Sequence, residues 1–118
     1  MRLENTGIEN ESLELDRLTV IMEELGFVLA GQWDYERVTF DRKFESKDGT
    51  FYLRVQGYAQ EGDIGGKHAV IQLLPPLLGK HYYPHGVEYG DGETFPNNIV
   101  STSKSLLAQA KEQMEKIK

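Results

Sequence analysis

The residues best suited to metal binding or proton transfer gather in one short stretch of this 118-residue chain. His81 and His85 are separated by three residues, and Glu88 and Asp91 follow soon after the second histidine. Imidazole and carboxylate groups are ligands for zinc, nickel and iron, and histidine is the natural proton carrier near neutral pH. These four residues form the candidate loop site.

The backbone around the two histidines argues against a preformed metal centre. Residues four positions apart share a face on a helix, but Pro84 and Gly86 disfavour a helix here. We therefore expect neither a bound metal nor a cofactor, and we interpret residues 75–96 as a solvent-facing loop. The alternative hypothesis is a small-molecule or metal-binding enzyme that uses this loop, with His81 and His85 as base or ligands.

A second candidate site consists of polar and aromatic side chains on predicted strands. By strand parity they share the face that points away from the core. Tyrosine and arginine without lysine is the composition of interface centres, although an ordinary solvated sheet face also carries such residues. Both interpretations remain open at this point. The members of this candidate face are Arg37, Tyr52, Arg54, Tyr58, His68 and Gln72.

Other patterns exclude or weaken several classes of function. Trp33-Asp34-Tyr35 has the composition of a ligand-binding edge, but Trp33 is in phase with Phe27 and Leu29, which favours a structural role. No nucleophile elbow, phosphate loop or dinucleotide fingerprint occurs. The sequence has no cysteine, which excludes disulfides, thiolate zinc sites and cysteine nucleophiles.

Length and charge indicate one soluble domain, residues 1–118. The net charge is −6, and residues 1–25 alone hold seven acidic and two basic residues. Such a surface repels phosphate backbones, so nucleic acid is not an expected partner. The N-terminus does not resemble a signal peptide, and no apolar run approaches the roughly 20 residues of a membrane span. We therefore expect a cytoplasmic protein without a membrane partner.

Two predicted helices flank the strands that must position these sites. The first helix is expected over residues 12–25, with Asn10 or Ser12 as its N-cap and Gly26 as its C-terminal stop. The last helix is expected over residues 97–117, again with an asparagine N-cap. Each helix carries one apolar stripe at helical spacing.

Between the helices the pattern alternates as it does in strands. Before the first helix, Leu3 and Ile8 either form a short strand or tuck against the core. The earliest strand is apolar on both faces, which indicates a central strand or one covered on both sides. Loop 75–96 is expected to be irregular, with room for one short strand near residues 86–89. Strands are predicted over residues 27–33, 37–45, 50–60 and 67–74, with a hairpin turn at 46–49.

The element order α-β-β-β-β-α is typical of the α+β class. We expect an antiparallel sheet of four to five strands with both helices packed mainly on one face. The predicted core residues are Leu18, Phe27, Leu29, Phe40, Leu53, Ile71 and Leu106.

The segment GFVLAGQWDYERVTFDRKFE resembles the signature region of the YugN-like family of small bacterial proteins. The matching features are Gly26-Phe27 after the helix, Gly31-x-Trp33-Asp34-Tyr35 at the first turn, and Phe40-Asp41 in the next strand. The resemblance covers residues 8–60 well and the rest loosely, and residues 77–95 look shorter and different here. It implies a single cytoplasmic domain. Since the family has no assigned activity, it supplies no catalytic residues.

Our leading hypothesis is a non-enzymatic cytoplasmic binding or regulatory domain. It rests on the missing catalytic motifs and on the face rich in tyrosine and arginine. Because each helix has one apolar stripe, both can cover only one sheet face, which leaves the other open for a second copy of the chain. We therefore expect a homodimer through the open sheet face, weakened by Tyr52→Glu or Arg54→Glu. A small-molecule ligand of unknown identity or another protein is the alternative occupant.

Overall fold

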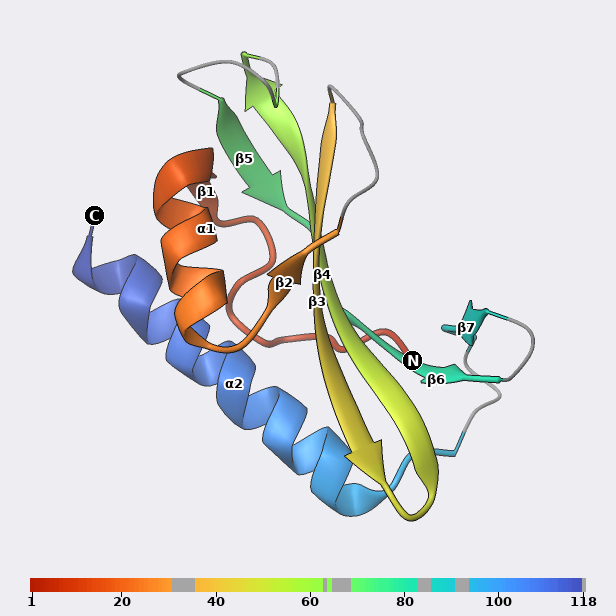
Figure 1. Ribbon diagram of the computed structural model, residues 1–118. Helices are drawn as coiled ribbons and strands as arrows, with labels where there is room; N and C mark the ends of the chain where they lie inside the picture. The colour runs from red at the N-terminus through yellow and green to blue at the C-terminus, as the bar shows by residue number, and fades with distance from the viewer. Residues whose placement is uncertain (31–35, 63, 65–68, 83–85, 91–93, 118) are drawn as a thin grey trace.

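The longest regular unit is a hairpin of two antiparallel strands, β3 (Arg37–Ser46) and β4 (Gly49–Glu61) (Figure 1). The computed structural model describes residues 1–30, 36–62, 64, 69–82, 86–90 and 94–117. β3 is paired with β4 along its whole length, and Ser46 lies opposite Gly49. The predicted turn at residues 46–49 is therefore confirmed, with a two-residue loop at its tip.

All the strands in the described part of the chain belong to one seven-stranded antiparallel sheet. The predicted α+β class is confirmed, although the sheet has more strands than the four or five expected. The main path runs β1 (Ser12–Glu14), β5 (Val70–Leu73), β4, β3 and β2 (Val28–Leu29). β6 (Leu77–His81) pairs with β4 beyond the end of β5, and β7 (Val87–Glu88) pairs with β6.

β5 and β6 lie end to end along the same edge of β4. Residues 57–61 of β4 pair with β5, and residues 51–54 pair with β6. The two prolines at positions 75 and 76 separate the strands, because proline has no N–H to contribute to the ladder. The expectation of an irregular loop is therefore wrong for residues 77–81, whereas the short strand near residues 86–89 is present as β7.

The N-terminal segment joins this outer edge of the sheet. The Leu3 N–H donates to the Pro76 carbonyl at 2.8 Å, and the Leu78 N–H donates to the Met1 carbonyl at 2.7 Å. Leu3 and Ile8 are both buried. The segment therefore pairs with β6 and also fills the core, which combines the two alternatives that the sequence left open.

α1 (Leu15–Glu24) begins later than predicted. Residues 12–14, expected inside the helix, instead form β1 beside β5, and no side-chain hydrogen bond caps the helix, contrary to prediction. The helix ends as predicted at Gly26, whose φ of +86° is unfavourable for residues with a side chain. The N–H groups of residues 26 and 27 donate back to the carbonyls of Glu23 and Met22, which is the Schellman arrangement.

β2 is an outer strand of the sheet, not the central strand that its two apolar faces suggested. Phe27 is buried as predicted, but Leu29 is 44% exposed and Val28 is 66% exposed. The reason is that no strand lies beyond β2 in the described residues. β2 also pairs only with Phe40 and Asp41, so the described chain provides no strand beside residues 42–46 on this edge of β3.

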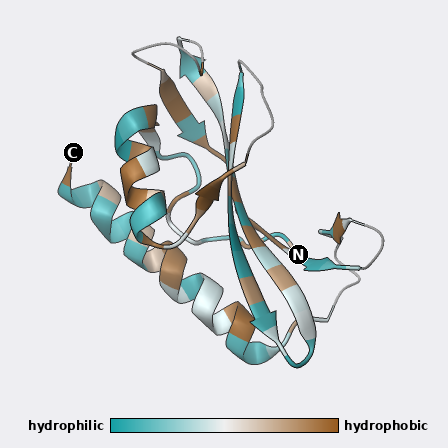
Figure 2. Cartoon of the chain, viewed as in Figure 1, coloured by the Kyte–Doolittle hydropathy of each residue, from teal (hydrophilic) through white to brown (hydrophobic). Residues whose placement is uncertain are grey.

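Both helices lie on the same side of the β3–β4 hairpin, and the core lies between helices and sheet (Figure 1). Figure 2 shows apolar residues on β5 and in bands along α1 and α2 (Asn97–Lys116). The prediction of a core face on the strands is confirmed, because Val38 and Phe40 of β3 and alternate residues of β4 from position 51 to 57 are buried. The predicted core residues that are buried are Leu18, Phe27, Phe40, Leu53, Ile71 and Leu106.

α2 matches the predicted helix closely but carries an unusual group in its buried stripe. Pro96 occupies the N-cap position without a side-chain hydrogen bond, so the expected asparagine cap is wrong. Ser103 is completely buried, and its hydroxyl has no hydrogen-bond partner among the described residues. Further along the same helix, Lys111 contacts the buried carboxylate of Glu11, and this contact joins the N-terminal segment to α2. No helix in the described ranges is long and apolar enough to span a bilayer.

Leu53→Ala should lower the free energy of unfolding by about 2–5 kcal/mol, because the fully buried side chain would leave a cavity at the centre of β4. Denaturant unfolding measures this loss. Leu29→Ala makes the same chemical change at an exposed position of β2 and should cost clearly less. Equal losses in the two variants would contradict the assignment of Leu53 to the core.

Ser103→Ala should raise the free energy of unfolding by about 1 kcal/mol, because it removes a buried hydroxyl that finds no hydrogen-bond partner among the described residues. Ser101→Ala is the matched control, since Ser101 is an exposed position of the same helix and reports the change in helix propensity alone. Thermal or denaturant melts compare the two variants. A Ser103→Ala variant that is less stable than this control would show that the hydroxyl has a stabilising partner.

Candidate binding site on the outer sheet face

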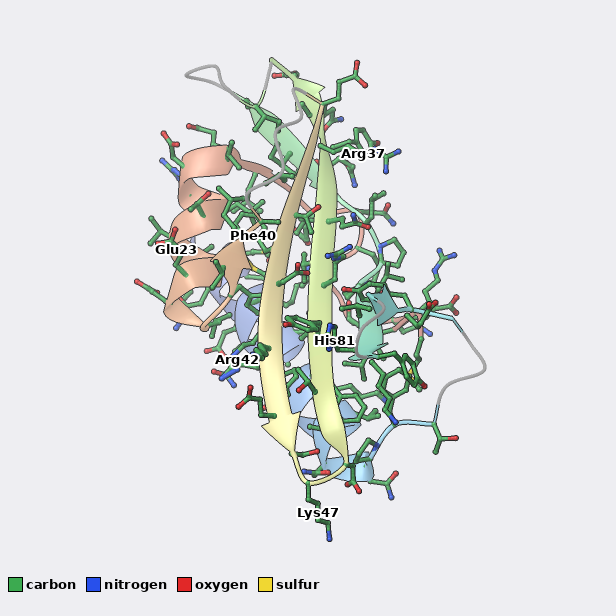
Figure 3. All side chains as sticks on the ribbon, turned by 45° about the vertical axis from the view of Figure 1, so that its right-hand side comes forward. Glu23, Arg37, Phe40, Arg42, Lys47 and His81 are labelled. Carbon is green, nitrogen blue, oxygen red and sulfur yellow. The ribbon has the colours of Figure 1, made fainter. Side chains whose placement is uncertain are left out.

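The sheet face opposite the two helices, here called the outer face, carries most of the predicted site residues. Figure 3 shows Arg37 and His81 on the side of the sheet away from α1. Strand pairing places the outer-face side chains in rows, because directly opposed residues point to the same side. Four of these rows are Arg37, Tyr58 and Gln72, then Thr39 and Gln56, then Asp41, Arg54 and Leu77, then Lys43, Tyr52 and Gly79.

The structure brings together five of the six residues of the candidate face. Arg37, Tyr52, Arg54, Tyr58 and Gln72 share the outer face, as strand parity predicts. Tyr58 is 42% exposed and Arg37 is exposed, whereas the other three are partly buried. The remaining member, at position 68, lies outside the described residues.

Polar side chains of this face bond to one another across the strands. Ser12 on β1 places its hydroxyl 2.8 Å from an amide oxygen of Gln72 and 3.0 Å from one of Gln60. On the neighbouring strands, the Gln56 side chain donates to the Thr39 hydroxyl at 3.3 Å. The part of the outer face formed by β1, β5 and the adjoining residues of β3 and β4 is thus a hydrogen-bonding surface with both donors and acceptors.

Asp41 and Arg54 form the strongest polar contact on the outer face. The Arg54 Nε lies 2.8 Å from Asp41 Oδ1, and its Nη2 lies 3.0 Å from Oδ2, so the guanidinium grips both carboxylate oxygens. The hydrogen bond to Asp41 raises the pKa of Arg54 against the opposing effect of burial. Asp41 was not among the predicted members of the candidate face, although the register of the predicted hairpin turn places it opposite Arg54.

Tyr89 lies on the other side of the Arg54 guanidinium. The guanidinium carbon is 4.8 Å from the centre of the Tyr89 ring, within the range of a cation–π contact. The ring also lies directly on β6, because a Cβ built on Gly79 would be 2.6 Å from two of its carbons. Arg54 is therefore held between a carboxylate and an aromatic ring. Tyr89 was not among the predicted site residues, since its position depends on β6, a strand that the sequence did not predict.

The Tyr89 hydroxyl is an unusual feature of this arrangement. It is buried and has no hydrogen-bond partner among the described residues. Burying a polar group without a partner costs about 1–3 kcal/mol. Burial also raises the pKa of Tyr89 to about 12, and the nearby Arg54 opposes that rise in part. The ring contacts favour this position, and the hydroxyl opposes it.

The candidate loop site is described only in part. His81 ends β6 and its ring centre lies 6.5 Å from that of Tyr52, edge to face. Glu88 is exposed on β7 and pairs across the strands with Lys80. Positions 85 and 91, like the Trp33-Asp34-Tyr35 turn, lie outside the described residues. Among the residues that are described, no group of three histidine or acidic side chains is arranged to hold a metal ion.

Tyr89 should ionise at higher pH than an ordinary tyrosine. Because the folded protein favours its neutral phenol, the stabilising effect is complete below about pH 10 and is lost as the pH rises through about 12. Alkaline titration followed by the ultraviolet absorbance of phenolate should show a late-ionising group that disappears in Tyr89→Phe. An unchanged titration curve in that variant, apart from the loss of one normal tyrosine, would contradict the burial of this ring.

Known proteins resemble this chain in sequence and in structure. The uncharacterized protein YlbA of Bacillus subtilis is 57% identical over 107 residues, which are 91% of this chain and 89% of that protein. The uncharacterized protein YugN of the same organism is 28% identical over 91 residues, covering 76% of this chain and 68% of its own. The crystal structure of the uncharacterized conserved protein YugN from Geobacillus kaustophilus matches with a TM-score of 0.87 and 59% identity, covering 99% of this chain and 97% of that one.

The model of the YugN-like family matches residues 3–116. The match extends well beyond residues 8–60, where the resemblance was clearest in the sequence. The chain belongs to the YugN-like family.

Proposed function

We propose that the protein is a non-enzymatic binding or regulatory domain whose contact surface is the outer sheet face, and that its partner there is a second copy of the chain. The observation that carries the proposal is the division of the sheet into two faces. Both helices pack on one face, while the row of Arg37, Tyr58 and Gln72 remains on the other (Figure 3). Tyrosine and arginine provide contact area and directional hydrogen bonds at interfaces.

The composition of the outer face supports self-association. A two-fold axis brings the same patch of two copies together, so the patch must complement itself. The hydroxyl and amide groups of Tyr58, Gln56 and Gln72 can each donate and accept hydrogen bonds. An arginine of one copy can likewise meet the aromatic ring of the other. This face thus presents both halves of each contact that the proposed dimer requires.

The dimensions of the sheet support a weak dimer. β4 has 13 residues. With a rise of about 3.4 Å per residue and about 4.8 Å between strands, three adjacent strands present a strip of roughly 500 Å². Two such strips would bury about 1,000 Å² in total, which is near the lower bound for a specific interface. We therefore propose a concentration-dependent dimer rather than an obligate one.

The alternative hypothesis of an enzyme centred on loop 75–96 receives less support from the described residues. His81 contacts the ring of Tyr52, and Glu88 is exposed on β7 opposite a lysine. A general base or a metal site needs groups that converge on one point.

We also propose that the domain works in the cytoplasm. The absence of cysteine from the sequence is compatible with a reducing compartment.

Tyr58→Glu should weaken self-association at least tenfold, because it places a carboxylate within the proposed contact and doubles it across the two-fold axis. Sedimentation velocity or light scattering over a wide concentration range measures the dissociation constant. Arg37→Glu should act in the same direction, as should Tyr52→Glu and Arg54→Glu, the changes that the sequence suggested.

Lys104→Glu is the control for Arg37→Glu, since it reverses one positive charge at an exposed position of α2 on the helix side of the molecule. It should leave self-association unchanged. A protein that stays monomeric at the highest attainable concentration would remove the dimer proposal. Equal weakening by Lys104→Glu would show that the effect is one of net charge and not of the outer face.

A further inference from the structure

The outer face carries a short segment that covers part of it. This segment, residues 87–90, consists of β7 followed by Tyr89 and Gly90, and it is called the latch below. β7 pairs with Lys80 and His81 at the end of β6 and not with β4. The latch therefore contacts the main sheet mainly through the side chain of Tyr89, which reaches back over β6 to Arg54.

Gly79 makes this contact possible. It faces outward, opposite Tyr52 in the strand register. A Cβ at this position would lie 2.6 Å from the Tyr89 ring and 2.6 Å from Val87 Cγ1. Real Cβ atoms do not approach other atoms so closely, and both atoms belong to the latch. Because Gly79 has no side chain, its backbone forms the floor of a slot that the Tyr89 ring fills.

Arg54 forms the wall of the same slot. Its two hydrogen bonds to Asp41 hold the guanidinium in a fixed orientation, and the ring of Tyr89 lies beside it. A guanidinium paired in this way still presents its flat side to an aromatic ring. While Tyr89 occupies the slot, that side of Arg54 is unavailable to any partner.

Within the described residues, the latch is held by few backbone contacts, and one of its groups opposes closure. Its backbone pairs with two residues of β6, and the amino group of Met1 donates to the carbonyls of Tyr89 and Gly90 at 2.8 and 3.5 Å. When the latch is closed, the Tyr89 hydroxyl finds no hydrogen-bond partner in the described part of the chain, whereas water would bond to it in an open state. Segments with few contacts open at a lower free-energy cost than the core does.

We propose that the latch is an autoinhibitory contact, in which Tyr89 occupies in its own chain the slot on Gly79 and Arg54 that an aromatic side chain of a second copy takes when the latch opens. The inference rests on the proposed self-association through the outer face. It adds that the strength of association depends on the balance between the closed and open latch.

Three substitutions should shift the balance between the closed and open latch in directions that follow from these contacts. Tyr89→Ala removes the occupant, and Gly79→Ala pushes the ring out of the slot, so both should open the latch. Tyr89→Phe keeps the ring and removes the buried hydroxyl, so it should close the latch further. Gly90→Ala is the matched control for Gly79→Ala, because a Cβ at Gly90 meets nothing within 4 Å.

The state of the latch is read from the reactivity of Arg54 toward phenylglyoxal, followed by peptide mass spectrometry, with Arg37 as the internal reference. Tyr89→Ala and Gly79→Ala should raise the Arg54 rate at least threefold relative to Arg37. Gly90→Ala should leave it unchanged, and Tyr89→Phe should not raise it. Unchanged Arg54 reactivity in Tyr89→Ala overturns the latch, whether or not the protein dimerises.

Self-association of the same variants is then measured by sedimentation. Tyr89→Ala should tighten the dimer at least threefold, because it empties the slot of each copy and leaves Gly79 without a side chain, so that an aromatic ring of the other copy can enter. Gly79→Ala should not tighten it, because its Cβ would occupy the same place in both copies. Tyr89→Phe should weaken it, while Gly90→Ala should match the unaltered chain. A dimer that weakens with Tyr58→Glu but keeps the same strength in Tyr89→Ala overturns the latch alone. The absence of any dimer in every variant overturns the proposed function and, with it, the regulatory role of the latch.

Discussion

The pairing register between β3 and β4 is the constraint on which both faces of the sheet depend. A two-residue turn closes the hairpin, and every opposed pair follows by counting back from it. Because strand side chains alternate with a period of two, the register that buries Phe40 and Leu53 also brings Asp41 opposite Arg54 on the other side. A slip of one residue would expose the core residues and force the ion pair toward the helices. The apolar core therefore fixes the geometry of the outer face.

The parts of the fold that depend on neighbouring residues could be predicted from the sequence. The turn at residues 46–49, the alternation in β4 and the long helix α2 are all local patterns, and the structure has them where expected. β1 and β6 could not be predicted, because each is a strand only by virtue of a partner far away in the chain. Leu29 was misassigned because an apolar strand at the edge of a sheet reads like one at its centre.

The same distinction separates the site residues that sequence reasoning found from those it missed. Tyr58 and Arg54 were assigned to the outer face from parity within one strand, which needs no knowledge of tertiary structure. Asp41 required the register of the hairpin as well, and the turn residues contain that information. Tyr89 could not be placed, because its ring reaches Arg54 only after β6 has paired with β4 and Gly79 has left room for it.

The uncovered edge of β3 has a consequence for how folded copies meet one another. An open strand edge offers its N–H and carbonyl groups to any extended chain and is a common starting point for aggregation. Residues 42–46 have no strand beside them in the described chain, yet Lys43 and Glu45 in this stretch are exposed and lie 3.0 Å apart as an ion pair. Arg42 adds a third charge, with its Nε bonded to the Leu25 carbonyl. An exposed ion pair contributes little to folding stability, but charges at a bare edge resist the approach of a second strand. These charges thus disfavour the edge-to-edge pairing through which folded sheet proteins polymerise.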